Sequence, residues 1–314
     1  MNLHELNLSV ANVCNADCIY CPKSLAPAPK TKFMPIELVK RIMEQITTED
    51  FKSKHQIIQS VLSENGECML HPDIIDIMRI VKNAGIPIMI FTNFSYLSEE
   101  KAEVIIKENL VHCIHFNMDG ATQESYFASK KLNLAIVEKN VMDFLKIRNE
   151  SGSNIRLFGH VISARTYTNS VLIKFREYPV KSKGREIPEA CDAEQTIKKW
   201  KVILHPDKDN IGIDPVFFWA ERYTREWPIV GDFSCSNIER VKHCAYINPD
   251  GDWYGCCFDI GNNLVIGNVY EQSIVEIAES EKRKSIIDML ENKRFRDIGW
   301  PCNRVDTCQG MEWT

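Results

Sequence analysis

The stretch "CNADCIYCP", residues 14–22, places three cysteines, Cys14, Cys18 and Cys21, within eight residues. The run "ELNLSVA" directly before it alternates apolar and polar residues, so the cysteines open the loop after a first expected β-strand. A chain of 314 residues buries about three quarters of its unfolded surface without a metal or disulfide. Twelve cysteines in such a chain therefore indicate a chemical role rather than a need for stabilising disulfides or structural metals.

Composition narrows the kind of chemistry. The start "MNLHELNLSV" lacks the basic and apolar regions of a signal peptide, and no uncharged apolar run approaches about 18 residues. We therefore expect a soluble cytoplasmic protein, where clustered cysteines are more often metal ligands or catalytic thiols than disulfides. The net charge of -5 gives no broad basic surface for nucleic acid or an anionic membrane.

Short apolar strands alternate with amphipathic helices through the first half of the chain. The expected helices are "PIELVKRIMEQI", "DIIDIMRIVKNAG", "SEEKAEVIIKENL" and residues 134–148. Strands separated by helices predict an α/β fold with a parallel sheet and right-handed crossovers. In such folds the active site lies at the C-terminal ends of the strands, where the cysteines and other polar residues of this chain gather.

The pattern changes in the second half. The alternation of strands and helices decays after about residue 175, and an aromatic and charged stretch follows at residues 217–227. The segment "YINPDGDWYGCCFD" predicts a hairpin with Asp250 and Gly251 in its turn, and residues 273–290 predict a long amphipathic helix. We therefore expect two domains, residues 1–215 and 216–314.

Four thiolates suit either zinc or an iron-sulfur cluster. Zinc sites usually present paired CxxC knuckles, whereas one loop here supplies three ligands and the next cysteine is Cys68. A four-iron cluster held by three thiolates keeps one iron open to an exogenous ligand. Half of a zinc site remains the alternative.

The CxxxCxΦC spacing, with Tyr20 before the last cysteine and a strand before the first, resembles the radical S-adenosylmethionine (SAM) superfamily. This resemblance implies a partial (β/α)6 TIM-like barrel in which Cys14, Cys18 and Cys21 hold a [4Fe-4S] cluster. The open iron of that cluster chelates SAM, and the reduced cluster cleaves SAM to a 5'-deoxyadenosyl radical. Tyr20 is then expected to contact the adenine.

Later segments extend the resemblance. "SENGECMLHPD" is similar to the Gly-Gly-Glu segment of the family, which implies that Gly66 and Glu67 receive the methionyl amino group. Asn65 and Cys68 stand where that segment often has glycine and proline. "FNMDG" is similar to the Ser-x-Asp-Gly segment, with Asn117 as the ribose contact and Lys130 as the nearest basic residue for the carboxylate.

The last 80 residues hold a second set of cysteines. Their order around Gly251 resembles the twitch or shortened SPASM extension of radical SAM enzymes, in which a small domain with a β-hairpin and a helix carries an auxiliary [4Fe-4S] cluster. The implied ligands are Cys235, Cys256, Cys302 and Cys308, with Cys244 or Cys257 as substitutes. The alternative is a zinc ribbon that only stabilises the tail.

The expected reaction follows from these two clusters. An adenosyl radical abstracts hydrogen from an unactivated C–H bond, and an auxiliary cluster can accept the remaining electron, which gives a two-electron oxidation. Such an oxidation needs a base, for which Glu221, Asp232 and Asp259 are candidates beside the cluster loops. A flavodoxin or ferredoxin-type partner is the expected reductant.

The substrate is less constrained than the reaction. The chain starts 13 residues before the first ligand, which leaves no room for an N-terminal leader-peptide domain and favours a small sugar or aminocyclitol alcohol. The second hypothesis is a peptide-modifying enzyme that performs epimerisation or crosslinking, in which Cys244 would return a hydrogen atom. The non-enzyme hypothesis is an iron-sulfur or zinc protein that carries electrons or serves as an interaction module.

Overall fold

The computed structural model describes residues 2–21, 23, 30–63, 65–163, 181–182, 185–186, 193–215, 233–259, 261–303 and 311–313. None of the helices in these ranges is both long and apolar enough to cross a lipid bilayer.

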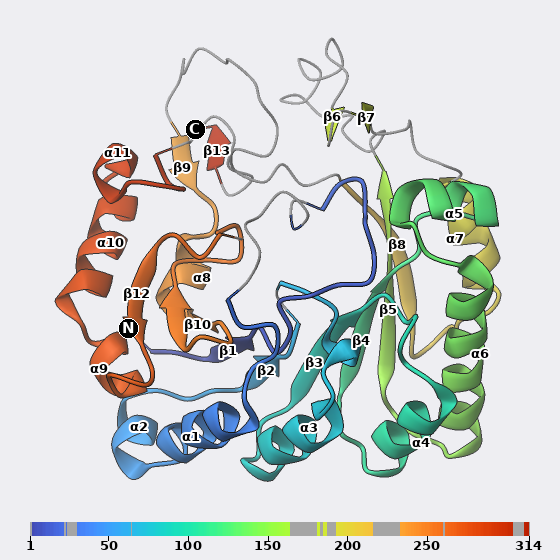
Figure 1. The fold of residues 1–314 in the computed structure, drawn as a ribbon, viewed down its shortest axis with the longest axis horizontal. Coiled ribbons are helices and arrows are strands. Elements are labelled where there is room, and N and C mark those ends of the chain that lie inside the picture. Colours follow the sequence, from blue (N-terminus) through green and yellow to red (C-terminus); the bar gives the residue numbers. More distant parts are fainter. Residues whose placement is uncertain are drawn as a thin grey trace.

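Six parallel strands form the centre of the structure (Figure 1). In spatial order they are β1 (Glu5–Leu8), β2 (Gln59–Val61), β3 (Ile88–Thr92), β4 (Cys113–Asn117), β5 (Arg156–Ser163) and β8 (Asn210–Pro215). The first five follow the order of the sequence, as successive right-handed crossovers produce. Among the described strands, β8 pairs only with β5, so the barrel stays open. The predicted α/β fold with a partial barrel is confirmed.

Helices cover the outer side of this sheet (Figure 1). Side-chain alternation explains the arrangement: Leu6 and Leu8 of β1 are buried in the outer core, whereas Glu5 and Asn7 bond to each other on the opposite, inner face. The crossover helices are α1 (Ile36–Ile46), α2 (Glu49–Lys54), α3 (Ile74–Asn83), α4 (Glu99–Lys107), α5 (Gln123–Lys130), α6 (Leu134–Glu150) and α7 (Ala193–Lys201), with a 3-10 turn at Cys68–Leu70.

The C-terminal part continues the same sheet. Strand β10 (Cys244–Ile247) pairs in parallel with β1, and β11 (Asp252–Tyr254) and β12 (Val265–Asn268) follow antiparallel. The predicted hairpin joins β10 to β11, and Gly251 in its turn has φ +82. A Cβ there would also lie 2.7 Å from the Tyr270 ring, so glycine is required. The remaining strands are β6 (Lys181–Ser182), β7 (Arg185–Glu186), β9 (Phe233–Cys235) and β13 (Met311–Trp313).

One expected helix needs correction, and several elements were not expected. The single helix expected over residues 273–290 is two helices, α9 (Ile274–Ala278) and α10 (Glu281–Glu291), because the Ser280 side chain accepts from the Arg283 N–H and starts a new helix. Helices α2, α5 and α7 and strand β8 were not expected. The short helices α8 (Ile238–His243) and α11 (Phe295–Ile298) complete the C-terminal part. The boundary expected near residue 215 adjoins residues 216–232, outside the described residues.

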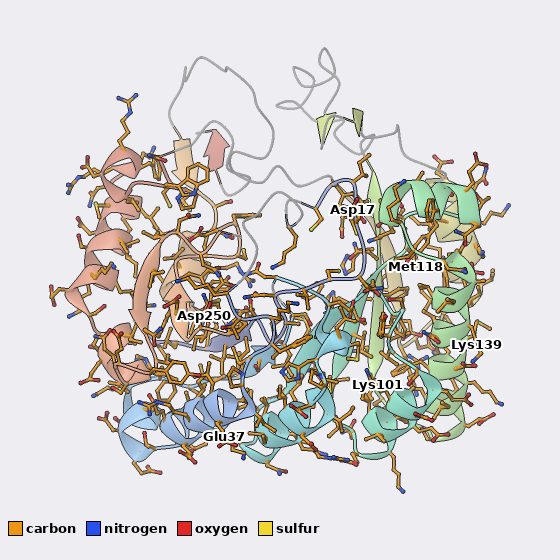
Figure 2. The ribbon with its side chains drawn as sticks, in the orientation of Figure 1. Asp17, Glu37, Lys101, Met118, Lys139 and Asp250 are labelled. Carbon is orange, nitrogen blue, oxygen red and sulfur yellow. The ribbon has the colours of Figure 1, made fainter. Side chains whose placement is uncertain are left out.

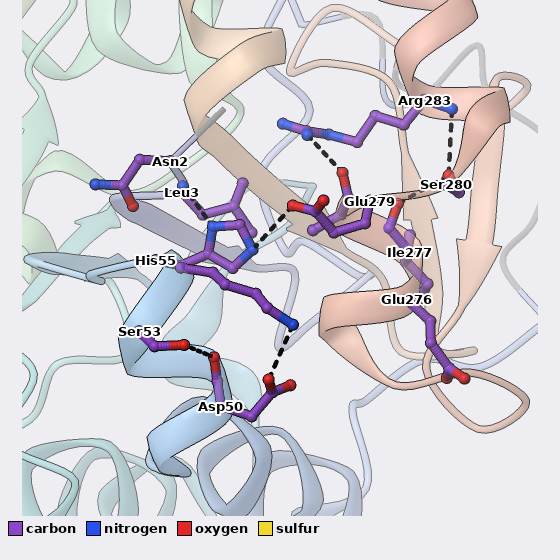
Figure 3. Close-up of polar contacts among 12 residues, drawn as sticks. Asn2, Leu3, Asp50, Ser53, His55, Glu276, Ile277, Glu279, Ser280 and Arg283 are labelled. Atoms are coloured by element: carbon purple, nitrogen blue, oxygen red, sulfur yellow. Dashed lines mark hydrogen bonds and ion pairs between the residues drawn. The ribbon is translucent and has the colours of Figure 1, made fainter.

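A buried histidine joins the barrel to the C-terminal helices (Figure 3). His55 follows α2, and its Nδ1 accepts from the Leu3 N–H at 3.3 Å. Its Nε2 therefore carries the proton and lies 3.9 Å from the carboxylate of Glu279, at the end of α9. Burial lowers the pKa of His55 despite this carboxylate. The neutral ring is thus the form that fits between the two parts.

This contact predicts acid sensitivity. Because the pKa of His55 is lower in the folded than in the unfolded chain, its contribution to stability is lost as pH falls below about 6.5. We expect His55→Gln to reduce the pH dependence of unfolding below that pH, by at most about 1.4 kcal/mol per pH unit. Urea denaturation between pH 7 and pH 5 measures this difference. Ser53→Ala, on the same helix, is the control, and equal slopes for wild type and His55→Gln would contradict the prediction.

Candidate active site

The cysteine loop lies over the C-terminal ends of the strands and is held by the end of α5. The Asp17 N–H donates to the Lys130 carbonyl at 3.0 Å, and the Ile19 N–H donates to the Ser129 carbonyl at 2.8 Å. Figure 2 labels Asp17 beside α5. Within the loop, the Cys21 N–H donates to the Cys18 carbonyl at 3.1 Å and closes a tight turn. The three predicted ligands therefore come from one anchored loop.

The thiols of this loop are close enough to influence one another. Burial raises the pKa of Cys14 to about 11 and that of Cys18 to about 12. Negative charge on Cys21 raises both pKa values further, and the Lys130 ammonium opposes the effect. Three neighbouring thiolates thus need a cation to offset their repulsion, as metal ligands do. This donor set fits a [4Fe-4S] cluster, whose irons bind the deprotonated form.

The Gly-Glu segment after β2 supports the same loop. The Glu67 N–H donates to the Val13 carbonyl at 2.9 Å. A Cβ on Gly66 would lie 2.3 Å from the Ala11 carbonyl oxygen and 2.5 Å from that of Val13. Only glycine therefore allows this segment to lie against the chain that enters the cysteine loop.

The carboxylate of Glu67 is buried and already accepts hydrogen bonds from the protein. It accepts from the Met69 N–H at 3.0 Å, the Thr92 hydroxyl at 2.7 Å and the Asn93 N–H at 2.7 Å. Burial raises the pKa of Glu67, and these donors oppose the rise. The contact of Glu67 with a methionyl amino group stays a prediction.

Asn93, at the end of β3, is a site residue that sequence reasoning did not single out. Its Nδ2 donates to Asn15 Oδ1 at 3.0 Å and lies 4.0 Å from Cys14 Sγ. Its backbone N–H also bonds to Glu67. The signal available in the sequence was its place at the C-terminal end of a parallel strand.

Tyr20 and Lys130 meet at Asp119, a residue that sequence reasoning named only as part of the segment "FNMDG". The Tyr20 hydroxyl donates to Asp119, and Lys130 Nζ lies 2.7 Å from Asp119 Oδ2. Lys130 is 3% exposed and also lies 5.1 Å from the centre of the Tyr20 ring. Burial lowers the pKa of Lys130, but Asp119, Cys18 and Tyr126 together more than reverse this, so the ammonium stays charged. The predicted contact of Lys130 with a carboxylate ligand is untested, and here it pairs with Asp119.

Asn117 ends β4 with its side chain on the inner face, in register with His160 of β5. Among the described residues its amide forms no side-chain hydrogen bond, and it is partly exposed. The position is compatible with the predicted ribose contact.

A second thiol site lies in the C-terminal part. A cavity there is lined by Cys235, Cys256 and Cys302 and by the apolar side chains of Val241, Phe258, Leu264, Ile286 and Leu290. Strand β13 pairs with β9 and places Met311 opposite Cys235. The fourth predicted ligand, Cys308, lies outside the described residues. Thiols around an apolar cavity are the donor type that an iron-sulfur cluster needs, although among the described residues no three metal-ligating side chains converge closely enough to hold an ion.

The two substitute ligands lie elsewhere. Cys257 accepts from Asn237 Nδ2 at 3.3 Å and does not line the cavity. Cys244 is buried on β10 with its Sγ 3.6 Å from Glu5 Oε1, and burial raises its pKa to about 12. The geometry therefore favours Cys235 over Cys244 as a ligand.

Of the three base candidates, only Asp259 falls within the described residues; Glu221 and Asp232 lie outside them. Asp259 lines the thiol cavity and is 1% exposed. Its carboxylate accepts from Asn263 N–H, Asn263 Nδ2 and Leu264 N–H at 2.7 to 3.0 Å. These bonds shape the loop after Cys256, although burial raises the pKa of Asp259.

Comparison with known proteins agrees with this geometry. Residues 8–164 match the family model described as the radical SAM superfamily. The chain belongs to the radical SAM superfamily. Residues 235–309 match SPASM, the iron-sulfur cluster-binding domain, and this range contains all four predicted auxiliary ligands. The cofactors are therefore a SAM-binding [4Fe-4S] cluster, S-adenosylmethionine and an auxiliary iron-sulfur cluster.

Solved structures share the fold at low sequence identity. BtrN in complex with AdoMet and 2-DOIA has 16% identity and a TM-score of 0.54, covering 99% of this chain and 94% of that chain. Streptococcus suis SuiB bound to S-adenosylmethionine has 15% identity and a TM-score of 0.59, covering 92% and 68%. The anSMEcpe structure with AdoMet and the Cp18Cys peptide has 11% identity and a TM-score of 0.57, covering 99% and 89%. No curated protein sequence matches significantly.

The close approach of Gly66 predicts a selective defect. We expect Gly66→Ala to push the Gly-Glu segment away from the cysteine loop and to reduce assembly of the N-terminal cluster. Iron content after anaerobic reconstitution should fall from about eight to about four per chain, because the auxiliary site remains. Gly212→Ala is the control, since a Cβ at Gly212 meets no atom within 4 Å. Full iron content in Gly66→Ala would contradict the prediction.

Proposed function

We propose that this radical SAM enzyme oxidises a C–H bond of a small polar alcohol, such as a sugar or aminocyclitol, and passes one electron to its auxiliary cluster. When bound, the N-terminal cluster and SAM supply the carbon radical that removes a hydrogen atom, and the auxiliary cluster supplies an electron acceptor. Supporting this is the apolar cavity with three thiols, because a cluster enclosed by protein ligands can accept an electron without binding substrate.

Separate groups of residues would hold the two clusters and position the Tyr20 ring. Cys14, Cys18 and Cys21 would hold the SAM-binding cluster, with Asn93 beside Cys14. Cys235, Cys256 and Cys302 would hold the auxiliary cluster, with Cys308 as the expected fourth ligand. The pair of Asp119 and Lys130 would fix the Tyr20 ring under the cofactor.

The inner face of the barrel favours a polar substrate. The partly exposed His115, Asn117 and His160 lie on this face, between apolar residues that point to the helices. Such a surface can bind hydroxyl and amino groups by hydrogen bonds. BtrN, whose structure holds AdoMet and 2-DOIA, matches this chain over nearly its full length.

A peptide substrate is the second candidate. It is favoured by the fold shared with anSMEcpe, whose structure holds a Cp18Cys peptide, and with SuiB, whose structure holds the precursor peptide SuiA. If the reaction were epimerisation, the peptide would lose no electrons overall. The reaction would instead need a hydrogen donor, for which the buried Cys244 thiol is the predicted residue.

The cluster assignment predicts a clean separation by mutation. We expect a Cys14→Ala, Cys18→Ala, Cys21→Ala variant to keep about four irons and to lose cleavage of SAM, because the auxiliary cluster has its own ligands. Iron analysis and the release of 5'-deoxyadenosine under reductant measure the two effects. Cys113→Ala, a buried cysteine outside both sites, is the control. SAM cleavage by the triple variant would refute the assignment.

The substrate proposal is tested by isotope transfer. We expect C-deuterated alcohol probes, including 2-DOIA, to transfer deuterium to 5'-deoxyadenosine and to yield a carbonyl product. The parallel assay uses Cp18Cys and SuiA peptides prepared in deuterated solvent and examined by mass spectrometry. Mass changes in a peptide, with no oxidation of any alcohol, would favour the second candidate.

A further inference from the structure

Three titratable side chains from adjacent strands form a chain of hydrogen bonds on the inner face of the barrel. His115 of β4 places its Nδ1 2.8 Å from Nε2 of His160 on β5. His160 Nδ1 in turn bonds to Oδ2 of Asp214 on β8. These residues lie 45 and 54 positions apart in the sequence, and parallel pairing of the three strands brings them together.

The direction of these bonds follows from the chemistry of the groups. An ionised carboxylate only accepts, so His160 must donate to Asp214 from Nδ1. A neutral His160 then has an unprotonated Nε2, which must accept from the Nδ1–H of His115. A neutral His115 consequently carries its free lone pair on Nε2. This series of hydrogen bonds therefore ends at His115 Nε2, whose free lone pair can act as a base.

The surroundings keep His115 neutral and oriented. Its ring stacks on Phe158 at 4.8 Å and lies 4.7 Å from Phe91. Burial, then His160 and His112, lower the pKa of His115 to about 4; Asp214 opposes this and Arg156 adds to it. His160, His112, Asp214 and Arg156 are the ionisable groups with the largest influence on the ring among the described residues. Nε2 of His115 forms no hydrogen bond with any residue that the structure describes, and these residues do not enclose the atom.

The three hydrogen-bonded side chains lie next to the expected reaction centre. His115 and Asn117 are two positions apart on β4, so they share the inner face and are separated by about 7 Å. Asn117 is the predicted ribose contact, and His160 lies opposite it in register. A substrate bound beside the adenosyl group over these strands would therefore meet His115. Among the earlier base candidates, Asp259 is less suited, because its carboxylate is committed to its own loop and lines the other cavity.

We propose that His115 is the catalytic base of the oxidation, and that His160 and Asp214 are positioning residues that draw the accepted proton away from the substrate. This inference rests on the proposed function for its substrate class, an alcohol. The two histidines and the carboxylate form a relay, named here the His115–His160–Asp214 relay.

The proposed step balances in atoms and electrons. The carbinol C–H bond breaks, and its hydrogen atom goes to the adenosyl radical that SAM supplies. The hydroxyl proton of the resulting α-hydroxy radical goes to Nε2 of His115, and the remaining electron goes to the auxiliary cluster, so the C–O bond becomes a carbonyl. Within the relay, the Nδ1 proton of His115 moves to His160, and the positive charge comes to rest beside Asp214.

The relay can be tested without turnover. In the oxidised holoenzyme at pH 8, 15N spectra of labelled histidine should show both rings protonated at Nδ1, the reverse of the tautomer that free histidine prefers. Loss of signals in His115→Gln and His160→Gln assigns the resonances. We expect Asp214→Asn to lower the pKa for uptake of one proton by the pair by about one unit or more, because it removes the charge that stabilises the imidazolium. Either ring protonated at Nε2, or an unchanged pKa, would overturn the relay.

The role as base is tested with an alcohol probe that the wild type oxidises. His115→Gln should reduce the carbonyl product by about 100-fold or more, while deuterium transfer to 5'-deoxyadenosine changes by less than about twofold. Asp214→Asn should shift the pH profile of product formation to lower pH. His205→Gln, in the loop before β8, is the control. A parallel loss of product and deuterium transfer in His115→Gln would overturn the base assignment.

The two proposals fail in distinguishable ways. In the first case, the wild type oxidises no alcohol probe, but its histidines show the Nδ1 tautomers and the Asp214→Asn shift of the pKa. The proposed function then fails, and with it the role of His115 in alcohol oxidation, while the relay itself stands. If the wild type oxidises a probe and the histidines show the ordinary tautomer, the proposed function stands and the relay fails.

Discussion

The parallel pairing of β1 with both β2 and β10 is the constraint on which the rest of the structure depends. The cysteine loop follows β1 directly, so the hydrogen bonds of this strand fix where the first set of thiols lies. The hairpin that leads to the second set begins with β10, on the other side of β1. The backbone ladder therefore sets the relation between the two thiol sites. Within the C-terminal part, the buried Arg283 of α10 donates to the Val241 and Ala278 carbonyls and so ties α10 to α8 and α9.

The buried pair of Asp119 and Lys130 shows how charged side chains can hold the elements of a site together. Both side chains are about 3% exposed, and removing two charges from water costs more than a simple contact returns unless further hydrogen bonds compensate. Asp119 has such bonds, from the Tyr20 hydroxyl and from the Ile162 N–H at 2.6 Å. The pair thereby joins the cysteine loop, α5 and β5. Its cationic member also offsets negative charge on Cys18.

Much of the first half of the fold could be predicted because its helices and strands carry regular patterns and clear caps, such as Ser98 before α4. Strand β8 was missed because its sequence "NIGIDP", although Ile211 and Ile213 do alternate with polar positions, is short and contains Gly212 and Pro215, residues that are depleted in strands. The helix break at Ser280 depends on a cap that competes with an otherwise continuous amphipathic pattern. The cysteine spacing is local in sequence and was visible. The relay joins residues on three strands, and no spacing within one segment signals it.

Oxidation of an alcohol separates a hydrogen atom, a proton and an electron, and each needs its own acceptor. The groups suited to accept the proton and the electron lie toward opposite ends of the sheet, whose strand order Figure 1 shows. The relay lies on β4, β5 and β8, and the thiol cavity lies beyond β10. A proton moves only along hydrogen bonds, so its acceptor must touch the substrate. An electron can reach a cluster that does not touch the substrate. The polar relay on the inner face and the apolar thiol cavity at the sheet's far end therefore match these two different requirements.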